Sequence, residues 1–347
     1  MKIEMKHGAG GSLMDELLKK EIISILSSDD IDVPLSYMDD SSVINGISIT
    51  TDSYTVRPYF FPGGDIGKLS ISGTINDLTM IGSVPIALSS GIVVEEGFDM
   101  DDLKKIIKSM KETLDYSGTK IITGDFKVME HGKLDGIIIN TSGIGKRSPY
   151  LDHNFEVVNS YSKHDENWLL DKNLKDGDVI IVTGYVGDHG VSVLSAREGI
   201  SFETEVISDV APLNKMFEEI LKVGGIVSAK DPTRGGIANA LNEMAEKSNV
   251  GMIIREEDVP VREGVRSACE MLGIDPFEIG NEGKAILGVV PDMADEIIKV
   301  LKKTREGKDA SIIGTVKKDL EYVILETAVG GKRILERPIG DPVPRIC

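Results

Sequence analysis

The sequence predicts an α/β protein with mixed sheets, two domains and a short C-terminal tail. Segments with strand periodicity alternate with segments of helical periodicity along the whole chain. The 347 residues are enough for two domains of ordinary size, and 41% of them are apolar, which allows a packed core in each. A polar, weakly periodic stretch rich in turn-forming residues interrupts the alternation near residue 150.

The first series of elements precedes this stretch. Residues 47–56 alternate apolar and polar side chains, as a half-buried strand does. The glycine pair in FFPGGD leads into a helix that carries Asp77, and residues 100–118 repeat apolar side chains at helical spacing. The segments 120–126 and 136–145 then predict two buried strands.

The second series follows the polar stretch. Residues 178–184 predict a strand, and residues 211–225 predict an amphipathic helix. Further strands are predicted at 251–256, 284–290, 311–316 and 322–327. We therefore predict an N-terminal domain over residues 1–150, a C-terminal α/β domain over residues 151–338 and a flexible tail over residues 339–347.

The tail ends in DPVPRIC, and its Cys347 is one of only 2 cysteines in the chain. Pro342 and Pro344 favour an extended backbone and lack the N–H donors of regular structure, so we expect the tail to project from the fold. From Ile339 onward it can reach about 30 Å at roughly 3.3 Å per residue. The other cysteine, Cys269, lies in a helical pattern typical of a small buried side chain.

Composition excludes several classes of protein. The chain has 39 Lys and Arg against 57 Asp and Glu, and a formal net charge of −18 repels nucleic acids and anionic membranes. The N-terminal MKIEMKHGAG lacks a signal-peptide core, and no apolar run approaches the roughly 20 residues that span a bilayer. We expect a cytoplasmic protein with neither a nucleic-acid partner nor a membrane partner.

The candidate functional residues are mainly aspartates beside turns and glycines. They are Asp39, Asp40, Asp52, Asp77, Asp125 and Asp231. Any one alone is more often a turn former or helix cap. Asp77 differs because it follows Asn76 in the small, apolar segment ISGTINDLTMIG, where an unpaired carboxylate is costly to bury. A cation would remove that cost, and Mg²⁺ with a nucleotide suits a few converging carboxylates.

Other motifs narrow the chemistry. The loop HGAGG, with Gly8, Gly10 and Gly11, precedes a predicted helix and offers backbone donors for phosphate. A Walker-type phosphate loop and a GxSxG nucleophile motif are both absent from the sequence. The histidines and cysteines have no metal-ligand spacing, which excludes a structural zinc site.

Together these motifs resemble the HypE family of hydrogenase maturation proteins. The resemblance spans residues 5–347 and rests on PYFFPGGDIGKLSISGTINDLTMIG, TGDFKVMEHGKLDG, GDHG, DPTRGG, GNEGK and the terminal PRIC. That family belongs to an ATP-using superfamily with aminoimidazole ribonucleotide synthetase, selenophosphate synthetase and thiamine monophosphate kinase. The resemblance implies the aminoimidazole ribonucleotide synthetase-like fold, a homodimer formed through the N-terminal sheet, and ATP in the cleft between the domains.

The resemblance also implies which residues form the ATP site. The residues expected to bind ATP are Gly8, Gly10, Gly11, Asp40, Asp52, Asn76, Asp77, Asp125 and Asp231, of which Asp40, Asp77 and Asp231 would also hold Mg²⁺. The HGAGG loop would cover the phosphates. Glu282 of GNEGK is expected to act as a base, and Lys127 of TGDFKV is expected to contact the carboxamide or phosphate.

In that family the terminal cysteine is itself a substrate. HypF transfers a carbamoyl group to its sulfur, and the protein uses ATP to dehydrate the S-carboxamide to an S-cyanide. The cyanide then passes to iron on the HypC–HypD complex, for insertion into [NiFe] hydrogenase. Because an amide oxygen is a poor leaving group, it is converted into phosphate while a base removes protons from nitrogen. Cys347 would carry the reacting group here.

Two features depart from the family pattern, and two alternative functions stay open. Phe126 stands where threonine is usual, which removes a hydroxyl near Lys127, and the segment around Trp168 is longer than usual. A selenophosphate synthetase-like or other ATP-dependent activating enzyme is one alternative, although HGAGGSLMDE lacks the cysteine and lysine of selenophosphate synthetase. The other is a non-catalytic carrier of the Cys347 thiol, which ATP hydrolysis dependent on the carbamoylated tail would exclude.

Overall fold

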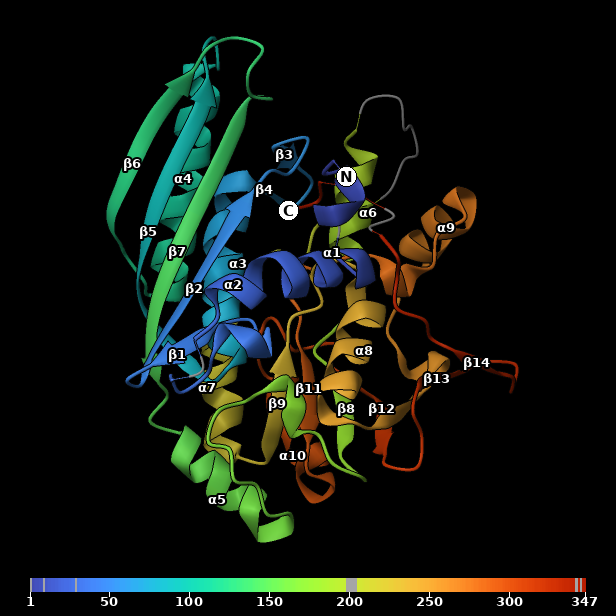
Figure 1. The fold of residues 1–347 in the computed structure, drawn as a ribbon. Helices are drawn as coiled ribbons and strands as arrows, with labels where there is room; N and C mark the ends of the chain where they lie inside the picture. Colours follow the sequence, from blue (N-terminus) through green and yellow to red (C-terminus); the bar gives the residue numbers. More distant parts are fainter. Residues whose placement is uncertain (1, 9, 29, 198–204, 341–342, 344) are drawn as a thin grey trace.

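The computed structural model describes residues 2–8, 10–28, 30–197, 205–340, 343 and 345–347. Two halves, each built on a mixed β-sheet with helices packed against it, lie side by side (Figure 1). This confirms the predicted mixed α/β class. Pro342 and Pro344, on which the prediction of an extended tail rested, lie outside the described residues.

The N-terminal sheet contains five strands in the described part of the chain, in the order β1-β2-β7-β5-β6. Their bounds are β1 (Ser42–Ile44), β2 (Ile47–Tyr54), β5 (Ser83–Glu95), β6 (Ile121–Met129) and β7 (Ile137–Arg147). Only β5 and β6 pair in parallel. The short strands β3 (Phe60–Phe61) and β4 (Gly64–Asp65) form a separate hairpin.

Two long helices, α3 (Ile66–Met80) and α4 (Met100–Ser117), cover one face of this sheet. Helix α3 is buried along almost its whole length. It begins at a capped end, where the Asp65 carboxylate accepts hydrogen bonds from the backbone N–H groups of Gly67 at 2.7 Å and Lys68 at 2.9 Å. The cap and the packing fix the position of Asn76 and Asp77 near the other end of α3.

The C-terminal sheet contains seven strands among the described residues, in the order β14-β13-β10-β12-β8-β11-β9. The strands are β8 (Val179–Val182), β9 (Ile226–Lys230), β10 (Gly251–Arg255), β11 (Ile286–Val289), β12 (Ser311–Lys317), β13 (Val323–Glu326) and β14 (Lys332–Ile334). The helices are α5 (Leu151–Tyr161), α6 (Asp188–Ser195), α7 (Asn214–Val223), α8 (Gly236–Ser248), α9 (Glu263–Leu272) and α10 (Ala294–Leu301). The predicted strands and the helix of the second series are thus confirmed.

The N-terminal helices cross over to this second half. Helices α1 (Ser12–Leu17) and α2 (Ser24–Leu26) are continuous with the π-helical segment Leu18–Ile23 between them. Asp15 forms an ion pair of 2.6 Å with Arg337, and Lys19 lies 3.7 Å from Glu246 of α8. The start of the chain is therefore joined to the half that follows residue 150.

Two predictions of local structure are wrong. Strand β6 forms, but residues 122–129 are exposed, because β6 is the outermost strand of its sheet. The stretch predicted to be irregular near residue 150 contains α5, in which Leu151, Phe155 and Val158 recur at helical spacing and are buried. The many polar residues between these three positions masked the periodicity.

The tail does not project from the fold. Val343 is completely buried and Ile346 is 1% exposed. The backbone N–H groups of Thr55 and Arg57, just beyond β2, donate to a C-terminal carboxylate oxygen of Cys347 at 3.0 Å and to the carbonyl oxygen of Arg345 at 3.2 Å. The prediction of a projecting tail is therefore wrong for these residues, which lie between the two halves near β3 and α6 (Figure 1). No helix of the described chain is long and apolar enough to cross a membrane.

We expect Asp65→Ala to destabilise the protein by about 1 kcal/mol, because two N–H groups at the start of α3 lose their acceptor. Urea unfolding followed by fluorescence and circular dichroism measures the change. Asp295→Ala, an exposed aspartate in the first turn of α10, is the matched control. Equal unfolding midpoints for the two variants would contradict the role of the cap.

Candidate functional site

Carboxylates from four separate segments gather where the two halves meet. Asp40 precedes β1, Asp52 lies on β2, Asp77 lies on α3 and Asp231 follows β9. Thr50 on β2 ties two of them together, since its hydroxyl contacts the Asp77 carboxylate at 2.8 Å and the Asp40 carbonyl oxygen at 3.1 Å. The structure thus brings together four of the aspartates that the sequence singled out, with Glu282 beside them.

The charges of this acidic cluster act on one another. Burial raises the pKa of Asp77 well above its usual value, and the nearby Asp231 carboxylate raises it further. Burial and Asp40 raise the pKa of Asp231 in the same way, and burial and Asp231 raise that of Glu282. Asp231 Oδ2 and Glu282 Oε1 are buried without a hydrogen-bond partner. The cluster therefore has a strong electrostatic affinity for positive charge.

Lys230, the last residue of β9, neutralises negative charge on one side of the cluster. Its ammonium group lies 2.9 Å from Asp40, 3.0 Å from Asp171 and 3.2 Å from Glu243 of α8. Burial raises the pKa of Asp40, and Lys230 opposes that shift. Sequence analysis missed Lys230, although its place directly before the DPTRGG motif was a usable signal.

Arg234, within DPTRGG, faces the other side of the cluster. Negative charge at Cys347 raises the pKa of its guanidinium, and the carboxylates of Asp52 and Glu282 add to the effect. Arg234 in turn opposes the rise that burial causes in the pKa of Asp52. Sequence analysis quoted the motif without selecting this arginine, because spacing alone does not show which way a loop side chain points.

Asn76 and Glu282 are fixed by backbone contacts across the interface of the two halves. The Asn76 amide donates to the carbonyl oxygen of Ala211 at 3.1 Å and accepts from the Leu213 N–H at 2.8 Å. The Glu282 N–H donates to the Asp209 carboxylate at 3.1 Å. Asn76 therefore holds the two halves together in this structure, and its predicted contact with ATP stays a prediction.

The glycine-rich loop packs against DPTRGG. Gly10 and Gly11 have φ of 78° and 77°, and a Cβ at Gly10 would lie 2.8 Å from the Arg234 Cβ. A Cβ at Gly11 would collide with the carbonyl oxygen of Pro338, where the tail begins. Gly8 is exposed. A cavity of about 360 Å³ lies between this loop, Asp40 and Asp231.

Asp125 and Lys127 lie apart from the acidic cluster. They form an ion pair with each other on β6, at the outer edge of the N-terminal sheet, and each side chain is 65% exposed. Figure 1 shows β6 on the side of the sheet away from β9 and α8. One chain by itself therefore does not bring the predicted Asp125 and Lys127 into the site.

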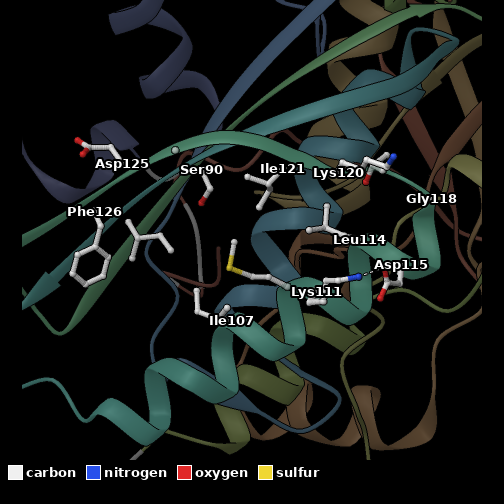
Figure 2. A pocket seen from close by; sticks show the side chains of 14 residues that line it. Ser90, Ile107, Lys111, Leu114, Asp115, Gly118, Lys120, Ile121, Asp125 and Phe126 are labelled. Carbon is white, nitrogen blue, oxygen red and sulfur yellow. Dashed lines mark hydrogen bonds and ion pairs between the residues drawn. The ribbon is translucent and has the colours of Figure 1, made fainter.

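A larger hollow of about 930 Å³ lies between β6 and α4, and Figure 2 shows the residues that line it. Ile107, Leu114 and Phe126 give it an apolar lining, whereas Asp125 points away. Phe126 and Lys127 are consecutive in a strand and face opposite sides. The threonine hydroxyl that Phe126 replaces would therefore lie on the face opposite Lys127.

Cys347 ends beside the acidic cluster. A C-terminal carboxylate oxygen of Cys347 accepts from the Thr55 N–H at 3.0 Å and from the Thr55 hydroxyl at 3.2 Å. Arg345 donates to the Thr55 carbonyl oxygen at 3.1 Å and forms a 2.7 Å ion pair with Asp135. The segment that binds the tail follows directly after β2, which carries Asp52, and the charges of Cys347 and Asp52 both act on Arg234.

Comparison with known proteins first defines the class. The N-terminal domain of AIR synthase related proteins matches residues 38–146, and the C-terminal domain of the same proteins matches residues 175–325. These matches, together with the two sheets and the acidic cluster between them, define a two-domain AIR synthase related protein.

Full-length relatives then define the family. A putative hydrogenase expression/formation protein from Methanocaldococcus jannaschii is 46% identical and covers 100% of both chains. Carbamoyl dehydratase HypE from Azotobacter vinelandii is 40% identical, over 99% of this chain and 97% of its own. The chain belongs to the HypE family of hydrogenase maturation proteins, as its motifs predicted.

Solved structures agree with this assignment. A structure of HypE in complex with ATP matches with a TM-score of 0.79 and 37% identity over 100% of both chains. A HypE chain from a HypE–HypF complex matches with a TM-score of 0.83 and 42% identity, over 94% of this chain and 100% of that one.

We expect Lys230→Met to cost about 3–5 kcal/mol of stability, because it leaves buried carboxylates without their counter-ion. Lys299→Met is the matched control, since Lys299 pairs with Glu296 on the surface and contributes less than about 1 kcal/mol. Denaturant unfolding of both variants measures the difference. Similar losses of stability in the two variants would show that Lys230 is not the counter-ion that neutralises the buried carboxylates.

Proposed function

We propose that this chain catalyses the ATP-dependent dehydration of an S-carboxamide on its own Cys347 to an S-cyanide, which supplies the cyanide ligand for [NiFe] hydrogenase. The observation that carries the proposal is the docked tail: Cys347 is bound by Thr55, next to the strand of Asp52, and Arg234 faces both Cys347 and the cluster. Relatives named carbamoyl dehydratase HypE support the same reaction.

The reaction balances as follows. The carboxamide oxygen attacks the γ-phosphoryl group of ATP, and ADP leaves. Two protons then leave the nitrogen while the C–O bond breaks, so the products are the S-cyanide, ADP and phosphate. ATP supplies the phosphoryl group that makes the oxygen a leaving group. The remaining requirements are position, charge neutralisation and a base, which the chain itself provides.

Glu282 is suited to the role of the base. Its carboxyl group is buried, its Oε1 lacks a hydrogen-bond partner, and burial and Asp231 raise its pKa, so it binds a proton more readily than an ordinary glutamate. Its backbone is fixed by Asp209, so the carboxyl group is held in one place. Arg234 lies across from it and would stabilise negative charge that develops on the carboxamide oxygen.

Mg²⁺ would accompany ATP, held by Asp40, Asp77 and Asp231. The partnerless Asp231 Oδ2 and the raised pKa of Asp77 support this proposal, because a cation would stabilise both buried carboxylates. Among the described residues no group of three or more His, Cys, Asp or Glu side chains is arranged to hold a metal ion by itself. We therefore propose that phosphates of ATP and water complete the shell. The backbone of Gly10 and Gly11 would border the phosphates, while Gly8 and Asn76 remain weaker candidates.

HypF, the HypC–HypD complex and a second copy of the chain are the proposed partners. A HypE–HypF complex among similar structures supports the first. Transfer of carbamoyl and cyanide groups requires the tail to leave its docked position and meet HypF and then HypC–HypD. Neither Cys269 nor Cys347 forms a disulfide bond, which fits a reducing cytoplasm.

The N-terminal sheet supports the proposed homodimer. Its outer face exposes Ile47, Ile49 and Ile144 by 46%, 45% and 38%. In the described part of the chain β1 pairs with β2 only at residues 47–49, which leaves the edge at residues 50–54 without a strand. If β6 of a second copy paired with that edge, its Asp125 and Lys127 would lie beside Asp52. The site would then contain residues of both copies.

The dehydratase reaction is tested by intact-protein mass spectrometry after incubation with HypF, carbamoyl phosphate, ATP and Mg²⁺. We expect a carbamoyl adduct that loses one water in the wild type, an adduct that keeps it in Glu282→Gln, and no adduct in Cys347→Ala. An adduct that never loses water in the wild type, or modification of Cys347→Ala, would overturn the proposal.

The shared site is tested by co-expression of two inactive variants. Chains with Lys127→Ala and chains with Glu282→Gln should regain dehydration together, because one site of the mixed dimer takes Lys127 from one copy and Glu282 from the other. Glu282→Gln combined with Asp77→Asn is the matched control and should stay inactive, since both residues come from the same copy. If the Lys127→Ala and Glu282→Gln chains do not regain dehydration together, Lys127 does not act in the site of the other copy.

A further inference from the structure

We propose that His189 is a positioning residue that holds the peptide before Cys347, so that the modified sulfur meets Arg234 and Glu282 in one register. The proposal deepens the proposed function and rests on it, because it concerns the same tail and the same dehydration. His189 is outside the acidic cluster and is the histidine of the GDHG motif.

His189 contacts the tail directly. It lies in the first turn of α6 and is completely buried. Its Nε2 is 2.7 Å from the carbonyl oxygen of Ile346, and its Nδ1 is 2.8 Å from the Ser208 hydroxyl oxygen. The ring stands edge-on to Phe61, with centroids 5.3 Å apart. Both ring nitrogens therefore have a hydrogen-bond partner and the ring packs against Phe61, so the imidazole has a single orientation.

The neighbouring hydrogen bonds fix the proton on Nε2. The Ser208 hydroxyl oxygen accepts from the Val210 N–H at 3.1 Å, which leaves its own proton for Nδ1. The Ile346 carbonyl oxygen can only accept, so Nε2 must donate. Burial lowers the pKa of His189, which favours the neutral ring that this chain of donors requires. His189 is thus a preorganised donor to the tail.

The tail is held from two sides. Arg345 has a positive φ of 57°, so the backbone turns there and is not a regular strand. The Arg345 carbonyl oxygen accepts from Arg57 and a C-terminal carboxylate oxygen of Cys347 accepts from Thr55, both in the segment that follows β2. The carbonyl oxygen between them, of Ile346, accepts from His189. Through His189 the second half of the molecule contacts the peptide group between Ile346 and Cys347.

The position of this peptide matters because it sets where the Cys347 side chain lies. The Ile346 side chain helps to define that position. A Cβ at Gly280 would lie 2.5 Å from Ile346 Cδ1 and 2.6 Å from the carbonyl oxygen of Thr233, the residue before Arg234. The Ile346 side chain therefore packs beside the loop that carries Arg234.

His189 is also connected to the proposed base. Ser208, which orients the ring, is followed by Asp209, whose carboxylate accepts from the Glu282 N–H at 3.1 Å. One short segment therefore aligns both the donor that holds the tail and the residue that would remove its protons. Loss of His189 should slow dehydration and leave carbamoylation by HypF unchanged, because the tail must be undocked to meet HypF.

The experiment measures both half-reactions by intact mass in single turnover, for the wild type, His189→Leu, His189→Gln and Ser208→Ala. In His189→Leu we expect normal carbamoylation and dehydration that is at least ~10-fold slower than in the wild type, as the loss of one buried hydrogen bond predicts. His189→Gln keeps a donor near the place of Nε2 and should recover much of the rate. His153→Leu replaces an exposed histidine and is the matched control.

ATP affinity by calorimetry and the melting temperature show whether each variant is folded. If His189→Leu does not fold, Ser208→Ala keeps the test open, since it removes only the group that orients the ring and should slow dehydration alone. Dehydration at the wild-type rate in folded His189→Leu, or equal slowing in His189→Leu and His189→Gln, would overturn the role of His189. A wild type that is carbamoylated but never dehydrates would instead refute the proposed function.

Discussion

The buried negative charge between the two halves is the constraint on which the rest of the structure depends. Carboxylates of the acidic cluster raise one another's pKa, and such a group is stable only when cations face it. Lys230 neutralises the side toward α8, and Arg234 faces the side toward the tail. The charge that remains is directed into the cavity beside the glycine-rich loop, where a nucleotide with its metal ion would complete the balance.

Rigid supports hold this arrangement in place. The buried helix α3 carries Asn76 and Asp77 together, and Asn76 is bonded to the backbone on either side of Pro212 in the other half. Thr50 joins Asp40 to Asp77. The site is therefore built into the contact between the halves and does not belong to either sheet alone, which explains how a single cleft can serve a phosphoryl donor and a peptide.

The sequence predicted the mixed α/β fold and the gathering of Asp40, Asp52, Asp77 and Asp231, because periodicity and unusual buried carboxylates are local signals. It did not predict Lys230, Arg234 or His189, whose roles depend on which way a loop or helix end faces. It also gave the wrong position for the tail, since proline content describes backbone shape and not the surface that will receive it. The place of Lys127 depends on an edge strand, and strand periodicity does not reveal which strand is outermost.

The docked tail touches both halves of the molecule. It pairs with the backbone just after β2, it accepts from His189 at Ile346, and its Arg345 carbonyl oxygen also accepts from Arg197 at 3.0 Å. The docked peptide thus links the two halves. In the proposed function each cycle withdraws this link, so the two halves share fewest contacts at the moment when the tail is held by another protein, and the return of the tail would restore the link and load the site in a single event.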